Sequence, residues 1–151
     1  MPETIDIITI ILIFVGLLLI LIVPNIKWVK PNQVVVVERL GSFHRLLDKP
    51  GIYLLIPLVD RDIETVVTTV QKIERKLKIK ESETTVTTIV SFQMQIFDVK
   101  TFVYSAIDSL DTVMTHLKEA LEANQEIARI VEEIPQFATN YGFNITHLNF
   151  K

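Results

Sequence analysis

The stretch KPNQVVVVERLGSFHR (residues 30–45), continued by KPGIYLLIPLVD (residues 49–60), decides the fold. It alternates apolar runs with Gly and Pro-Gly turns, which is typical of successive β-strands joined by tight turns. We therefore expect a strand, a turn at Gly41, a second strand, a turn at Pro50-Gly51, and a third strand that Pro57 ends. Residues 34–37 are all valine, which indicates a strand buried on both faces.

An uncharged apolar run precedes this stretch. Residues 7–23 contain no charged side chain. At about 1.5 Å per residue, a helix that continues to residue 26 is about 30 Å long, which is enough to cross a bilayer. We predict a short acidic N-terminus (residues 1–6) and a transmembrane helix over residues 7–26. The predicted anchor and interfacial residues are Ile7, Ile10, Phe14, Leu18, Leu21, Val23 and Trp28.

A cleaved signal peptide is the alternative to an anchor. A signal peptide begins with a positive region, whereas Glu3 and Asp6 make this N-terminus acidic, and no small-residue cleavage site follows the apolar run. We therefore favour the anchor. No Lys or Arg precedes the run, and four follow it closely, so the positive-inside rule predicts a cytoplasmic C-terminal domain in a single-pass membrane protein. These four are Lys27, Lys30, Arg39 and Arg45.

Composition excludes several functions. The chain of 151 residues has no cysteine, so disulfides, thiolate catalysis, zinc-thiolate sites and palmitoylation are excluded. A net charge of −3 argues against nucleic-acid binding. The three histidines (44, 116 and 147) lie in different segments, and no catalytic or phosphate-binding motif is present. We expect no catalytic, cofactor or metal site, and hence no enzyme.

The remaining sequence predicts strands followed by helices and one returning strand, which is an α+β fold. Strands are expected over residues 62–70, 72–80 and 85–97, a short helix through Tyr104, and a final strand over residues 143–150. The last strand changes its apolar phase between Ile145 and Leu148, which predicts a bulge or a chain end that pairs poorly. Gly142 is the expected C-terminal cap of the preceding turn.

An apolar stripe predicts one long helix over residues 110–134, which Pro135 breaks or restarts. The stripe also fits a heptad, with Asn124 at a core position that fixes register, so the helix is a candidate for self-association. We favour the simpler reading, in which the stripe packs on the sheet of its own domain. The heptad residues in question are Leu110, Val113, Leu117, Asn124, Ile127 and Val131.

Two segments leave alternatives open. The apolar segment after Pro50 either dips into the membrane beside the anchor or forms a strand buried in the core. Its residues are Ile52, Tyr53, Leu54, Leu55, Ile56 and Leu58. The lysine-rich side of residues 72–80 either meets anionic headgroups or is a solvated sheet face, and we favour the solvated face.

The opening stretch resembles the start of the stomatin/prohibitin/flotillin (SPFH, band 7) superfamily, in which an anchor leads into "PNQ-apolar-VERLG-x-F" and "PG-apolar-IP-apolar-D". The matching residues are Pro31, Asn32, Gln33, Val37, Glu38, Arg39, Leu40, Gly41, Phe43, Pro50, Gly51, Ile56, Pro57 and Asp60. Weaker matches follow at Val86, Phe92, Asp98, Tyr104 and residues 140–145. The resemblance implies a small SPFH domain over residues 30–151, with a mostly antiparallel, curved sheet and packed helices.

The resemblance also implies a function. Such proteins organise membranes, so we expect a single-pass scaffold that binds membrane lipids, forms a homo-oligomer and modulates neighbouring membrane proteins such as a protease or a channel. Family members usually continue into a long coiled coil, whereas this sequence stops at Lys151, and the region between residues 109 and 138 is shorter than the family pattern. The alternative is therefore a membrane-tethered adaptor that binds one partner without forming rings.

Overall fold

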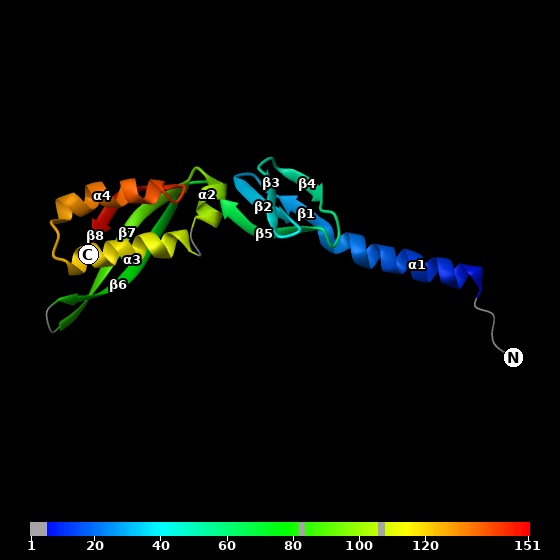
Figure 1. Ribbon diagram of the computed structural model, residues 1–151, viewed down its shortest axis with the longest axis horizontal. Coiled ribbons are helices and arrows are strands. Elements are labelled where there is room, and N and C mark those ends of the chain that lie inside the picture. Colours follow the sequence, from blue (N-terminus) through cyan, green and yellow to red (C-terminus); the bar gives the residue numbers. More distant parts are fainter. Residues whose placement is uncertain (1–5, 82–83, 106–107) are drawn as a thin grey trace. The chain divides into compact units, whose positions relative to one another are not determined.

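The computed structural model describes residues 6–81, 84–105 and 108–151. The chain divides into two compact units, Met1–Thr65 and Val66–Lys151 (Figure 1). Each unit contains its own β-sheet structure, and the helices other than the N-terminal one belong to the second unit.

The first unit begins with the apolar helix. Helix α1 (Ile7–Ile22) continues into a short 3-10 turn, η1 (Val23–Asn25), and none of its residues is buried. The helical run thus ends at Asn25, one residue before the predicted end. Five strands follow, which are β1 (Ile26–Val29), β2 (Gln33–Arg39), β3 (Ser42–Leu47), β4 (Gly51–Leu54) and β5 (Asp60–Val67). Strand β1 pairs with β4, and a separate sheet has the order β3-β2-β5.

The valine run forms the centre of the first unit. Residues 34–37 of β2 are all buried, as the sequence predicts for a strand covered on both faces. Val35 and Val37 pack with Val29 of β1, Leu47 of β3 and Leu55 in a single apolar cluster. This cluster joins the β1–β4 pair to the β3-β2-β5 sheet.

The second unit is a three-stranded antiparallel sheet with helices. Strands β6 (Gln71–Glu81), β7 (Thr84–Ile96) and β8 (Phe143–Phe150) have the order β6-β7-β8. The short helix α2 (Val99–Tyr104) begins at Asp98, whose carboxylate accepts hydrogen bonds from Thr101. Helix α3 (Ser109–Glu122) packs against β6, and α4 (Ile127–Thr139) packs against both β8 and α3 (Figure 1).

The strand predicted for residues 85–97 is confirmed, and its residues alternate between the two faces of the sheet. Val90, Phe92, Met94 and Ile96 of β7 are buried, while the residues between them point to the other face of the sheet. The predicted bulge in the last strand is also confirmed. The β7–β8 register shifts between Ser91 and Gln93, and His147 takes a left-handed conformation at this point.

The prediction of a single helix over residues 110–134 is wrong. Helix α3 ends at Glu122, and α4 starts at Ile127. Asn124 lies in the turn with a φ of 53°, a left-handed conformation that asparagine tolerates better than most residues. The heptad therefore cannot run through Asn124. Pro135, expected to break or restart the helix, does neither and lies inside α4.

Candidate membrane-facing surface

The end of the apolar helix is tied directly to the first unit. The side-chain amide of Asn25 donates a hydrogen bond to the carbonyl oxygen of Leu21 at 2.7 Å, which closes the helical run. The backbone N–H of Leu55 donates to the carbonyl oxygen of Asn25 at 2.9 Å. Since Leu55 is a core residue, this bond joins the helix terminus to the folded part of the unit.

One face of the β1–β4 pair is apolar and exposed. Ile26 lies opposite Leu54, and Trp28 lies opposite Ile52, so the four side chains share a face of the antiparallel pair. Their exposed fractions range from 48% to 75%. An exposed apolar patch of this kind marks an interaction with a membrane, a protein or a ligand. This patch begins one residue after the apolar helix ends.

The opposite face of the same pair is the core. Val29 and Leu55 are buried, and Tyr53 packs against them with its hydroxyl donating to the carbonyl oxygen of Lys49 at 2.9 Å. The segment after Pro50 thus matches neither sequence reading as a whole. It is not buried on both faces, and Leu55 cannot contact lipid. Only its alternate residues are exposed, namely Ile52, Leu54, Ile56 and Leu58.

Two further leucines are exposed at loop tips in strained conformations. Leu40, in the β2–β3 turn, has a φ of 51° and is 80% exposed, while Leu58 has a φ of 64° and is 91% exposed. The left-handed conformation costs a leucine about 1–2 kcal/mol. The two loops are joined, because the backbone N–H of Leu40 donates to the carbonyl oxygen of Val59 at 3.0 Å. Strain of this kind points to a function for the side chains.

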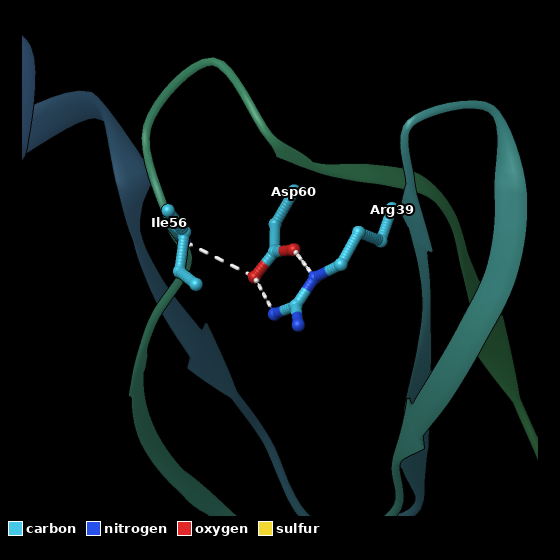
Figure 2. Close-up of polar contacts among 3 residues, drawn as sticks. All are labelled: Arg39, Ile56 and Asp60. Carbon is cyan, nitrogen blue, oxygen red and sulfur yellow. Dashed lines mark hydrogen bonds and ion pairs between the residues drawn. The ribbon is translucent and has the colours of Figure 1, made fainter.

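A part-buried ion pair holds these two loops in place (Figure 2). The Arg39 guanidinium donates two hydrogen bonds to the Asp60 carboxylate, from Nε at 2.7 Å and from Nη2 at 3.1 Å. The backbone N–H of Ile56 donates to the same carboxylate at 3.1 Å. The hydrogen bond from Arg39 lowers the pKa of Asp60 to about 2, although burial opposes this shift. No pattern in the sequence predicts this contact between Arg39 and Asp60.

The residues of the predicted self-association helix do not form one stripe. Val113 and Leu117 are buried in α3, Asn124 is in the turn, and Ile127 and Val131 are exposed on α4. The lysine side of β6 is exposed. The remaining helix residue, Leu110, is half-buried at the start of α3.

Chemically active clusters are lacking in the ranges that the structure describes. No group of three His, Cys, Asp or Glu side chains there lies close enough to hold a metal ion. His116 stacks on Phe137 and lies 3.4 Å from a carboxylate oxygen of Glu133, so it belongs to the contact between α3 and α4.

The family model of the SPFH domain / Band 7 family matches residues 27–140, more than half of the chain. The protein therefore belongs to the SPFH domain / Band 7 family, as the opening motif predicts, and its α+β fold with an N-terminal apolar helix agrees with this assignment. No match was found among curated proteins. Proteins of this family are in general membrane-associated scaffolds without catalytic activity.

Proposed function

We propose that this protein is a single-pass membrane scaffold that lies against one leaflet, self-associates and modulates neighbouring membrane proteins. Helix α1 is the anchor, since it has a mean hydropathy of 3.3 over a helical run of 19 residues and no buried residue. The charge that follows the helix favours a cytoplasmic position for the two units.

The exposed apolar face of the β1–β4 pair carries the proposal. Ile26, Trp28, Ile52 and Leu54 begin where the anchor ends, so a membrane that holds α1 lies within reach of them. Covering an apolar side chain of this size is worth about 1.5–3 kcal/mol. Tryptophan is also the residue that best suits the headgroup level, because its ring is apolar and its N–H is polar.

This contact gives the scaffold a mechanism that is positional rather than catalytic. An anchor alone leaves the attached domain free to rotate and tilt. A second, apolar contact beside the anchor fixes the first unit against the lipid, so that neighbouring copies present their sides to one another. Lateral association of such copies then sets the local membrane composition and the proteins held within it.

The mass of the full chain in lipid nanodiscs tests this function. Mass photometry, combined with crosslinking in the membrane, should give a discrete oligomer larger than a dimer. A monomer or dimer at high protein density would overturn the scaffold. If one other membrane protein, such as a protease or a channel, then co-purified in a fixed ratio, the adaptor function would replace it.

A further inference from the structure

The uncovered face of the second unit is basic. In the β6–β7 register, Lys76 lies opposite Ile89 and Lys78 opposite Thr87, whereas the helix-covered face holds Val90 and Phe92. Directly paired residues of an antiparallel sheet point to the same side. The lysines at alternate positions of β6 therefore share the face that α3 and α4 leave open. They are Lys72, Lys76, Lys78 and Lys80.

Few acidic groups balance these lysines. Within the described ranges, the carboxylate on this face of the sheet is that of Glu74, which lies 3.1 Å from the ammonium of Lys72. The ammonium groups of Lys76 and Lys78 have no carboxylate within ion-pair distance in the same ranges. The neighbouring side chains are hydroxyls and amides, namely Thr85, Thr87, Ser91, Gln93, Gln95, Asn144, Thr146 and Asn149.

Ile89 gives this basic face an apolar centre. It is 36% exposed, lies directly opposite Lys76, and is diagonal to Lys78. An apolar residue surrounded by lysines and hydroxyls has the composition of a small protein interface, in which an apolar centre lies within a polar rim.

The first two turns of α4 have the complementary composition. Ile127 and Val131 are one turn apart, and they are 57% and 40% exposed. Glu126 and Glu132 stand next to them in the sequence. Neither carboxylate has a partner among the residues that the structure describes, whereas Glu133, on the same helix, meets His116 and Arg129. The exposed apolar pair is thus bordered by two unpaired negative charges.

We propose that the basic face of β6 and β7 in one copy binds the exposed first two turns of α4 in a second copy. Ile89 packs on Ile127 and Val131, while Lys76 and Lys78 meet Glu126 and Glu132. Charge complementarity favours this pairing over like surfaces meeting, because lysines facing lysines would repel. The proposal rests on the proposed scaffold function and names the surface through which copies associate.

The two surfaces are different, so the contact is heterologous. Each copy would use its sheet face toward one neighbour and its α4 side toward the other. A heterologous contact closes into a ring or propagates as a filament, whereas an isologous contact stops at a dimer. This geometry suits a lateral membrane scaffold and does not use a coiled coil.

Charge reversal tests the pairing in the full chain, in nanodiscs of neutral lipid. The double variants Lys76→Glu/Lys78→Glu and Glu126→Lys/Glu132→Lys should each lower the oligomer fraction by about tenfold. The quadruple variant should restore it. Arg45→Glu and Glu119→Lys are controls with charge changes of the same sign and half the size, at exposed sites outside the contact. Normal assembly of either double variant would overturn the proposal, as would a quadruple variant that does not restore the assembly that the double variants lose.

Cysteine pairs test the heterologous geometry, because the natural chain has no cysteine. Chains with Lys78→Cys mixed with chains with Glu132→Cys should crosslink, and neither should crosslink alone. Crosslinking of either variant alone would overturn the proposal. A mixture of the two variants that forms oligomers without crosslinking would also overturn it, but would leave the scaffold function intact. Absence of any oligomer would remove both.

A membrane surface is the competing target of the lysines, and the lipid composition separates it from a second copy. If the lysine variant changes assembly only in nanodiscs with anionic lipid, and the glutamate variant has no effect, the lysines bind headgroups and the proposal is wrong.

Discussion

Trp28 and Ile52 lie directly opposite each other on the antiparallel strands β1 and β4, and both side chains are about three-quarters exposed. The adjacent pair, Ile26 and Leu54, continues this apolar face toward the end of the anchor helix. Water is a poor environment for such a face. This face follows α1 directly in the chain, so the bilayer in which we propose that α1 lies is the apolar surface next to it.

The fluorescence of Trp28 should therefore report a lipid environment. It is the single tryptophan of the chain, so the signal has one source. In proteoliposomes we expect blue-shifted emission and strong quenching by lipids brominated near the headgroup end of the acyl chain. Ile52→Asp should weaken the quenching, whereas Val70→Asp, at an exposed apolar residue of the second unit, should leave it unchanged. Water-like emission without quenching would contradict the membrane contact.

Replacing Leu40 should separate stability from membrane contact. Asparagine tolerates the left-handed conformation that leucine adopts at this position, so Leu40→Asn should stabilise the detergent-solubilised protein by about 1 kcal/mol. The same change removes an exposed apolar side chain and should reduce crosslinking of the loop to photoreactive lipid. Thermal unfolding and lipid crosslinking measure the two effects. A variant that loses stability would show that Leu40 has packing contacts in the fold.

Acid should loosen the joined loops through Asp60. Its pKa is about 2 in the folded protein, below the ordinary aspartate value of 3.8, so its ion pair contributes stability above pH 4 that is lost as pH falls through about 2. Thermal unfolding measured at pH values from about 5 to about 2 should show this loss of stability. Asp60→Asn should melt lower at pH 7 and have a shallower acid slope. A residual slope should remain, because hydrogen bonds from Thr101 also lower the pKa of Asp98. An unchanged slope would exclude the ion pair as its source.

Much of the fold follows from local pattern. The alternation of β7 predicts a strand, because a period of two fits a strand and not a helix. The valine run of β2 predicts a buried strand, because a fully apolar run needs cover on both faces. The turn at Gly41 was equally predictable, since its φ of 80° suits glycine. These features are determined by residues that are close together in the chain, so they can be predicted from local sequence.

The candidate site depended on contacts that a sequence does not display. Strand β1 is four residues long and follows an apolar helix directly, so its apolar residues cannot be told from the anchor in the sequence. The sequence therefore predicts Trp28 as an interfacial residue but does not predict the strand that holds it. The ion pair between Arg39 and Asp60 spans 21 residues. Motif matching singled out both residues, but nothing in their spacing says that they meet. Which residues after Pro50 are exposed also depended on the partner strand.

The close approach of β8 to α2 should make Gly142 irreplaceable. A Cβ at this position would overlap the carbonyl oxygen of Asp98, and the φ of Gly142 is 81°. Gly142→Ala should therefore cost about 2–5 kcal/mol, as backbone strain and steric overlap add. Gly41→Ala is the matched control, since its φ is 80° but no atom lies within 4 Å, and it should cost about 1 kcal/mol. Equal losses of stability in thermal or denaturant unfolding would remove the steric part of the argument.

Asn124 distinguishes the observed turn from the continuous heptad helix. In the turn, its backbone has a φ of 53°, and its N–H donates to the carbonyl oxygen of Leu121 at 3.1 Å. Asn124→Val places a β-branched residue in a left-handed conformation and should destabilise the protein by about 1–2 kcal/mol. Asn124→Gly should be neutral or slightly stabilising, because glycine adopts this conformation without strain. In a coiled coil the order reverses, since valine at a core position stabilises the helices and glycine weakens them. Thermal unfolding of the two variants beside the natural protein therefore decides between a helical hairpin and a self-associating helix.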